Sequence, residues 1–317
     1  MSKRLNVYML DALVKTPSPV VPLLDPVAQR AGVSLYLKRE DLLHGEFGGN
    51  KWRKLKYNLV ACAAQGAQAL LTFGGAYSNH LLATAAVGAA TGLATLGMVR
   101  GADADPHNPT LRRAAALGMR LYRVDRAEYR HRHDPDYWRS LRARFGDVYI
   151  VPEGGSNAQA MQGIAELVTE LRAQLPHFDA VCCPVGSAGT LAGIARALRS
   201  GEQAHGIAVL RGAQYLAQQV RALAGPEVAA PQLHHAYHQG GYARLTPALV
   251  RFCDAFTARH GIPLEPIYTG KTMLGVFDLI ARGTWAPGTV VVALHTGGLQ
   301  GLAGLAAQIA ALRLQEK

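Results

Sequence analysis

The chain has 317 residues, of which 49% are hydrophobic and 17% are charged, so it can form a large core and is too apolar for a disordered segment. Lys and Arg outnumber Asp and Glu by 33 to 22, a net charge of +11. No apolar run reaches the ~18 residues that a membrane-spanning helix needs, and residues 1–15 lack the apolar stretch of a signal peptide. We therefore expect a cytoplasmic protein with no membrane partner.

Arginine supplies much of the positive charge between residues 112 and 144. Such a stretch could bind a phosphate backbone, but no nucleic-acid-binding motif accompanies it. We interpret it as a solvated face and expect no nucleic-acid partner. The cysteines form no C-x-x-C pair, which is typical of a reducing compartment, and we expect them to be structural. They are Cys62, Cys182, Cys183 and Cys253.

Short runs rich in Val, Ile, Leu and Tyr alternate with helical segments along the chain. The predicted strands are residues 35–39, 69–74, 94–100, 120–124, 148–152, 180–185, 204–210 and 290–295. The predicted helices are residues 51–65, 78–91, 108–117, 158–175, 190–199, 247–260 and 273–281. Because several strands are apolar at nearly every position, we expect parallel sheets covered by helices, an open doubly wound α/β fold.

Four glycine-rich turns stand where predicted strands meet predicted helices. They read FGGNKWRK at residues 47–54, TFGGAYSNH at 72–80, PVGSAGT at 184–190 and LHTGGLQG at 294–301. Ligands of open α/β folds bind at such junctions, outside the carboxyl ends of the strands. We therefore expect the chemistry of the protein in these turns.

The first turn holds a lysine in a distinctive setting. Lys51 follows Gly48, Gly49 and Asn50 at the start of a predicted helix. The positive end of the helix and neighbouring cations oppose its ammonium form and should lower its pKa. A lysine of lowered pKa can form a Schiff base with an aldehyde. The alternative is an ordinary solvent-exposed lysine in the first turn of a helix.

Two further turns are candidate anion sites. The PVGSAGT turn follows an apolar strand and precedes a helix, so its N–H groups and the helix dipole favour a phosphate. It lacks the lysine of a P-loop, which favours a small phosphorylated cofactor over ATP; the alternative is a turn without a ligand. Its residues are Gly186, Ser187, Ala188, Gly189 and Thr190. Ser78, Asn79 and His80 open another helix, either as an ordinary cap or as a site for a carboxylate.

Histidines form two close groups, H-x-H at residues 131–133 and H-H-x-x-H at residues 234–238. Either group could bind a metal. No cysteine or carboxylate completes a convincing set of ligands, so we expect no metal site.

Seven motifs stand in the order found in one enzyme family. They are KRED at residues 38–41, GGNKWRKL at 48–55, SNH at 78–80, GGSN at 154–157, GSAGT at 186–190, YTGKTM at 268–273 and HTGG at 295–298. Together they resemble the pyridoxal 5'-phosphate (PLP) dependent family that contains D-cysteine desulfhydrase and 1-aminocyclopropane-1-carboxylate (ACC) deaminase. The resemblance runs from about residue 16 to residue 301, and it is specific because all seven motifs keep the family order.

The resemblance implies the tryptophan synthase β-like fold, known as fold type II. A small lobe at residues 48–151 would lie inside a large PLP-binding lobe made of residues 1–47 and 152–317. It also implies a homodimer whose substrate is a small amino acid.

The resemblance assigns roles to motif residues. Lys51 would bind PLP as a Schiff base, Lys54 and the 186–190 turn would hold its phosphate, and Asn79 would bind its phenolic oxygen. Ser78, Asn79 and His80 would receive the substrate carboxylate, although well-known members have glutamine at the position of His80. The implied catalytic residues are Lys51, Ser78, Tyr242 and Tyr268.

Thr269 bears on the choice of reaction. ACC deaminases carry a glutamate at this position, next to the pyridine nitrogen of the cofactor. A carboxylate would keep that nitrogen protonated, whereas the hydroxyl of Thr269 can only hydrogen-bond to it, which favours β-elimination. We expect D-cysteine desulfhydrase-like chemistry that gives pyruvate, ammonia and sulfide. The alternatives are ACC deamination to 2-oxobutanoate and ammonia, or a non-catalytic PLP- or nucleic-acid-binding protein.

Overall fold

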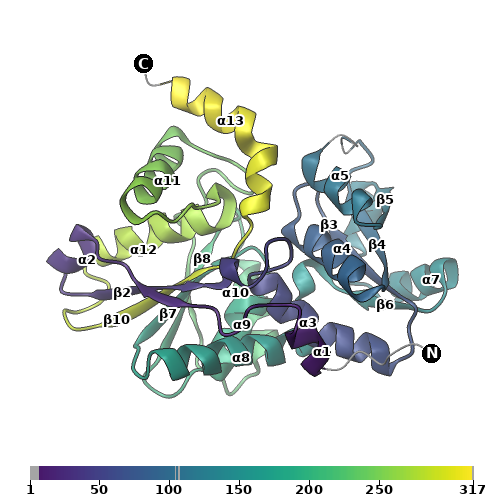
Figure 1. Ribbon diagram of the computed structural model, residues 1–317, viewed down its shortest axis with the longest axis horizontal. Coiled ribbons are helices and arrows are strands. Elements are labelled where there is room, and N and C mark those ends of the chain that lie inside the picture. The colour runs from purple at the N-terminus through teal and green to yellow at the C-terminus, as the bar shows by residue number, and fades with distance from the viewer. Residues whose placement is uncertain (1–6, 104, 106–107, 316–317) are drawn as a thin grey trace.

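The computed structural model describes residues 7–103, 105 and 108–315, and its strands form two sheets (Figure 1). The larger sheet has the order β1 (Val20–Pro22), β2 (Ser34–Arg39), β10 (Val290–His295), β7 (Ala180–Val185), β8 (Gln203–Ala208) and β9 (Gln232–His234). The smaller sheet has the order β5 (Arg120–Val124), β4 (Ala94–Arg100), β3 (Ala69–Gly74) and β6 (Val148–Val151). The smaller sheet is parallel, and in the larger one β1 alone runs antiparallel to its neighbour, β2.

Helices cover both sheets. The helices of the first half are α1 (Val7–Asp11), α2 (Pro26–Arg30), α3 (Asn50–Ala64), α4 (Asn79–Thr91), α5 (Pro109–Ala116), α6 (Arg126–Arg130) and α7 (Pro135–Phe145). Those of the second half are α8 (Ala158–Gln174), α9 (Gly189–Ala197), α10 (Tyr215–Ala224), α11 (Pro247–His260), α12 (Lys271–Ala281) and α13 (Leu302–Leu314). Short helical turns are η1 (Glu40–Leu42), η2 (Glu153–Gly155), the π-helix η3 (Pro266–Gly270) and η4 (Leu299–Gly301). Of the helices in the described ranges, none is long and apolar enough to cross a bilayer.

The predicted strands and helices are confirmed. All eight predicted strands are present, as β2 to β8 and β10, and each end lies within two residues of its prediction. The two strands that were not predicted, β1 and β9, have three residues each, and β1 corrects the expectation of purely parallel sheets. The overall architecture is therefore the predicted α/β fold with helices on both faces.

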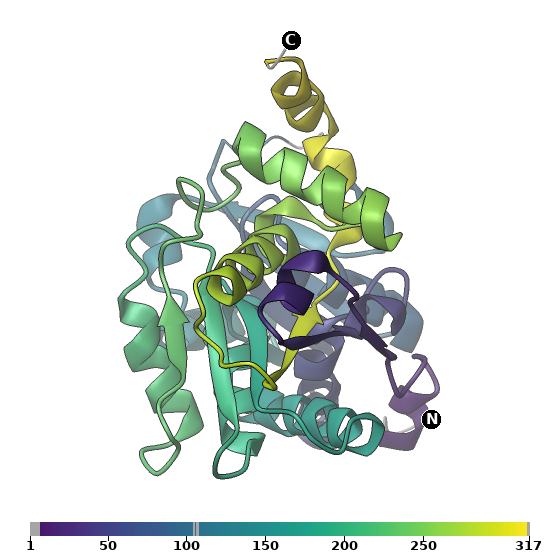
Figure 2. The same ribbon diagram turned by 90° about the vertical axis from the view of Figure 1, so that its left-hand side faces the viewer.

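The core lies on both faces of the larger sheet. Alternate residues of β7 face opposite sides, because Val181 and Cys183 pack with α8 and α9, whereas Cys182 packs with α11 and α12. Figures 1 and 2 show these helix layers on the two sides, with α13 projecting beside α11. The four cysteines are buried and unbonded, in keeping with thiols that serve packing.

Helix α3 is fixed by a close crossing with α8. A Cβ on Gly163 of α8 would lie 1.8 Å from the carbonyl oxygen of Arg53, so only glycine permits this approach. The Arg53 side chain, 1% exposed, pairs with Glu40 of η1 and Glu170 of α8. These contacts set the position of α3, which carries Lys51 and Lys54 on its first turn and a half.

A pair of histidines lies at the β8–β9 edge of the larger sheet. The ring of His205, which is fully buried, places Nδ1 3.1 Å from Nε2 of His234 and packs against Trp285. Burial, together with the charge of His234, lowers the pKa of His205 to about 4. Within the described residues, no group of three or more His, Cys, Asp or Glu is placed to hold a metal ion.

The His205 pair predicts acid sensitivity. The unfolded chain protonates this histidine below about pH 6.5, whereas the folded chain does so only near pH 4. The contribution of His205 to stability is therefore fully present above about pH 6.5 and is lost as the pH falls toward 4, at a cost of about 3 kcal/mol. Urea unfolding at pH 7 and pH 4.5 measures this loss. His205→Gln should show a smaller loss, whereas the exposed control His131→Gln should match the unmutated protein; equal losses in all three contradict the assignment.

Candidate active site

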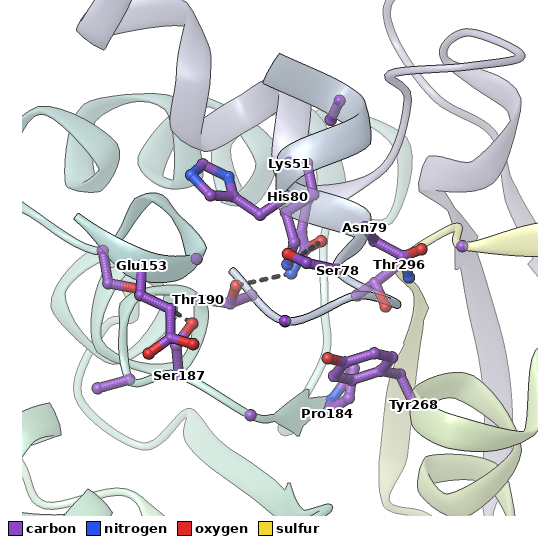
Figure 3. A pocket seen from close by; sticks show the side chains of 18 of the residues that line it. Lys51, Ser78, Asn79, His80, Glu153, Pro184, Ser187, Thr190, Tyr268 and Thr296 are labelled. Atoms are coloured by element: carbon purple, nitrogen blue, oxygen red, sulfur yellow. Dashed lines mark hydrogen bonds between the residues drawn. The ribbon is translucent and has the colours of Figure 1, made fainter. Parts of the chain in front are cut away.

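A cavity of about 400 Å³ lies where the carboxyl ends of both sheets meet. Its lining includes Gly75 after β3, Arg100 at the end of β4, Glu153 after β6, Gly186 after β7 and Thr296 after β10. The position agrees with the rule that ligands of open α/β sheets bind outside the carboxyl ends of strands. The volume falls in the range of small-molecule sites. Figure 3 shows several of the predicted site residues around this space, among them Lys51, Ser78, Asn79 and Tyr268.

Lys51 enters the cavity from the start of α3. The preceding Gly49 has φ +78°, and a Cβ on it would lie 2.1 Å from the carbonyl oxygen of Thr296, so glycine lets the turn after β10 meet the turn before α3. The Nζ of Lys51 lies 3.4 Å from Oδ1 of Asn50. Burial lowers the pKa of Lys51 to about 8. The direction of the shift is the predicted one, and burial accounts for it.

Lys54 lies one turn further along α3 and is fully buried. Its Nζ is 3.2 Å from Oγ of Ser156 and 3.3 Å from Oγ of Ser187. Burial, and then the charge of Lys51, lower the pKa of Lys54 well below its usual value. Within the described ranges, neither lysine has a carboxylate partner. Because an ammonium group buried without a counterion is unfavourable, the pair suits an anionic ligand.

The 186–190 turn adds further anion-binding groups beside Lys54. The Oγ atoms of Ser156 and Ser187 lie 3.1 Å apart, and the N–H of Gly189 donates to Ser156 Oγ at 3.2 Å. Thr190 Oγ1 accepts from the side chain of Asn50 at 2.9 Å. The turn lines the cavity except at Gly189, which packs on Ser156. Hydroxyls, the first N–H groups of α9 and a buried ammonium together form a site of the kind that holds a phosphate.

Ser78 and Asn79 present their side chains to the cavity at the start of α4 (Figure 3). Ser78 is the N-cap, and its Oγ accepts from the N–H of Leu81 at 3.3 Å. Asn79 lies against the turn after β10, with its Oδ1 3.5 Å from Nε2 of Gln300. The free N–H groups of the first helical turn can bind a carboxylate here.

The ring of His80 is bound inside the protein. Its Nε2 lies 2.8 Å from the hydroxyl of Thr72, which itself donates to the carbonyl oxygen of Val151, so Nε2 carries the proton. Burial, followed by the charges of Lys51 and Lys54, lowers the pKa of His80 well below its usual value and leaves the ring neutral. Its Nδ1 is then an acceptor and cannot donate to a carboxylate. Any contact between His80 and a substrate carboxylate therefore falls to its backbone N–H.

Two tyrosines close the cavity on the side of the larger sheet. The rings of Tyr242 and Tyr268 meet edge to face with centroids 6.2 Å apart, and Tyr242 Oη donates to the carbonyl oxygen of Tyr77 at 3.4 Å. Tyr268 lies on the π-helix η3, where the Glu265 carboxylate accepts from its N–H at 2.9 Å. Burial raises the pKa of both tyrosines. Both are therefore neutral hydroxyls that can donate a proton.

Thr269 is not among the residues that line the cavity. Its Oγ1 accepts from the N–H of Glu265 at 2.8 Å and donates to the carbonyl oxygen of Glu265 at 2.9 Å, and the residue is 1% exposed. The predicted contact of Thr269 with the cofactor ring therefore has no support in this arrangement. The hydroxyl residue that does face the cavity near Tyr268 is Thr296 (Figure 3).

Several residues that line the cavity lie in recognisable sequence patterns but have no predicted role. Ser156 and Thr296 belong to the GGSN and HTGG motifs. Arg100 and Glu153 stand at or just after the ends of predicted strands, where the strand-end rule alone would have selected them.

Comparison with known proteins places the chain in a family. Residues 12–297 match the family described as "Pyridoxal-phosphate dependent enzyme". The chain belongs to this family. A Thermotoga maritima protein provisionally named as an ACC deaminase is 32% identical over 302 residues, covering 90% of this chain and 95% of the relative. A Yersinia pestis (strain Pestoides F) protein named D-cysteine desulfhydrase is 30% identical over 299 residues, covering 88% and 91%.

Among solved structures, one described as an ACC deaminase homologue superimposes with a TM-score of 0.81 at 26% identity, covering 98% of this chain and all of the other. The predicted family, its fold type and PLP as the cofactor are thereby confirmed. The cavity fits PLP, because the Lys51–Lys54 pair lacks a carboxylate partner within the described ranges and adjoins the hydroxyls and N–H groups of the 186–190 turn.

Proposed function

We propose that the protein catalyses PLP-dependent β-elimination on a small amino acid, with D-cysteine desulfhydrase-like chemistry that gives pyruvate, ammonia and sulfide. The observation that carries this proposal is the shortage of carboxylates in the cavity. Of the described residues that line it, Glu153 alone is acidic. Its oxygens already accept from Nε of Arg132 at 2.6 Å and from the hydroxyl of Tyr129 at 2.8 Å.

The shortage of carboxylates in the cavity affects how strongly bound PLP can withdraw electrons from the substrate. Bound PLP supplies an electron sink for charge that develops at the substrate Cα. On the side of Tyr268 the cavity offers the hydroxyl of Thr296, which cannot keep the ring nitrogen protonated as an acidic side chain would. A cofactor that withdraws electrons only moderately suits a substrate whose β-substituent leaves readily, because the departing group takes the electron pair with it.

The remaining steps are assigned to residues around the cavity. The Lys51 amine, with a pKa of about 8, is a suitable base for the Cα proton near neutral pH. Tyr242 and Tyr268, both neutral, are candidate donors to a departing thiolate. Lys54 and the 186–190 turn would hold the cofactor phosphate, and the start of α4 would bind the substrate carboxylate.

The same proposal includes two lobes, with boundaries at residues 47/48 and 151/152, and a homodimer. Strands β3 to β6 all lie within residues 48–151, which supports the boundaries.

The second candidate is ACC deamination, supported by the relatives that carry this name. A substrate panel separates the two: D- and L-cysteine, both enantiomers of β-chloroalanine, and ACC, scored by release of pyruvate or 2-oxobutanoate. We expect pyruvate from the β-substituted substrates, with kcat/KM about 10- to 100-fold above the value for ACC. A difference of this size corresponds to that between a charged and a neutral side chain in contact with the cofactor ring. A higher kcat/KM for ACC would favour deamination, and a holoprotein inert toward the whole panel would contradict both.

A further inference from the structure

The outer end of the cavity carries an arginine that the proposed reaction does not use. Arg100 ends β4 and lines the cavity together with Arg132 and Glu153. Tyr215 and Gln219 of α10 line the same cavity. None of these residues belongs to the turns assigned to the cofactor.

The charges at this end do not cancel. Glu153 is occupied by Arg132 and by the hydroxyl of Tyr129. Within the part of the chain that the structure describes, Arg100 has no carboxylate partner, and its guanidinium lies over one ring, that of Tyr129, at 5.7 Å from the centroid. Arg132 contacts the same ring at 5.0 Å. Burial lowers the pKa of His133, so this histidine is neutral. The outer end thus keeps one positive charge in excess.

The guanidinium of Arg100 lies close to the substrate-binding turn. A Cβ on Gly75 would lie 3.4 Å from its Nη2, and Gly75 is three residues before Ser78. On the other side, burial raises the pKa of Tyr242 while the Arg100 charge opposes that rise, so the guanidinium is within electrostatic reach of the tyrosine hydroxyl. Arg100 therefore lies beside the turn before α4 and within electrostatic reach of Tyr242, on the lining of the cavity.

We infer that Arg100 binds a negatively charged group at the end of the substrate side chain, so that the protein selects amino acids whose β-substituent carries an anion. This inference rests on the proposed function, because that function already assigns the substrate carboxylate to the start of α4 and the cofactor phosphate to the 186–190 turn with Lys54. Arg100 is then a cation with no assigned partner, and it is available to bind a third anion. Hydrogen bonds of a guanidinium to a carboxylate are strong enough to raise affinity by about 10- to 100-fold.

Two cysteine derivatives that differ only in charge provide the test. S-carboxymethylcysteine ends in a carboxylate, and S-carbamoylmethylcysteine ends in the amide of the same size; both enantiomers of each are used. In the elimination, the Cα proton goes to Lys51, the Cβ–S bond breaks and the electron pair leaves with sulfur. Hydrolysis then gives pyruvate, ammonia and either mercaptoacetate or mercaptoacetamide, with no oxidant or reductant required. Pyruvate release gives kcat/KM for each substrate.

The expected result is a preference of about 10- to 100-fold for the carboxymethyl substrate, expressed mainly in KM. Arg100→Met should bring the ratio close to one, and Arg100→Lys should keep part of it. The control Arg123→Met removes an exposed arginine of the neighbouring strand β5 that does not line this cavity, and it should keep the full ratio. A ratio near one in the unmutated protein, or an unchanged ratio in Arg100→Met, would overturn the inference.

The failure of the proposed function would be visible separately. If neither derivative nor β-chloroalanine yields pyruvate, the elimination is wrong, and calorimetric binding of the two derivatives to the holoprotein then decides the inference. Tighter binding of the carboxymethyl form that disappears in Arg100→Met supports an anion site. Equal binding of both forms overturns it.

Discussion

Replacement of Lys51 by alanine is expected to lower kcat/KM for pyruvate release by at least about 10³-fold, because the proposed function assigns to this one side chain both the covalent attachment of PLP and the removal of the Cα proton. The amine stands in the cavity with its pKa lowered to about 8. Borohydride reduction of the unmutated holoprotein, followed by mass spectrometry, should place the cofactor on the peptide that contains residue 51. In Lys51→Ala the reducible link should be absent.

The exposed Lys15 provides the matched control, and Lys15→Ala should keep both turnover and the link. Full activity of Lys51→Ala, or a cofactor found on another lysine, would refute the assignment.

The lowered pKa of Lys51 also predicts how the apoprotein takes up PLP. Because the unprotonated amine attacks the aldehyde, the rate of uptake should rise about tenfold per pH unit below pH 8 and level off above it. A lysine of ordinary pKa would show no plateau before about pH 10.

The sheets were predictable because buried parallel strands are apolar at nearly every position. The unpredicted strands β1 and β9 have only three residues each, too few to form such a run. Helices α1, α2 and α6 have five residues, little more than one turn, so no periodicity can develop. Helices α7 and α10, of 11 and 10 residues, are also absent from the prediction, although they are long enough for an amphipathic pattern to develop. Helix α13 is absent for another reason. Its sequence, LAGLAAQIAALRL, is apolar around most of its circumference and has no amphipathic pattern.

The glycine turns of the site were predictable because strand ends and helix starts can be located from sequence. The direction in which a side chain points was not. Tyr268 and Thr269 are adjacent in the sequence, but on the π-helix η3 one lines the cavity and the other binds the backbone of Glu265. His80 likewise follows Asn79, yet its ring is held by Thr72 of β3. Such orientations depend on tertiary partners, which a motif does not contain.

The largest effect on stability is expected at Arg53. Its guanidinium makes two hydrogen bonds to Glu40, at 2.9 and 3.0 Å, and two to Glu170, at 2.7 and 2.6 Å. Arg53 is 1% exposed and Glu40 is fully buried. Arg53→Met would leave the Glu40 carboxylate buried without its main counterion, so the free energy of unfolding should fall by about 3–5 kcal/mol. Urea unfolding monitored by circular dichroism measures this change.

Arg313→Met is the control for loss of an ion pair at the surface. Arg313 makes hydrogen bonds of the same kind to Asp254, but both side chains are about half exposed, so its loss should cost no more than about 1 kcal/mol. A cost for Arg53→Met no larger than this would contradict the assignment. Adding Glu40→Gln to Arg53→Met should recover part of the loss, since it removes the unpaired charge. Because α3 also carries Lys51, Arg53→Met should weaken PLP binding in the folded protein, whereas Arg313→Met should not.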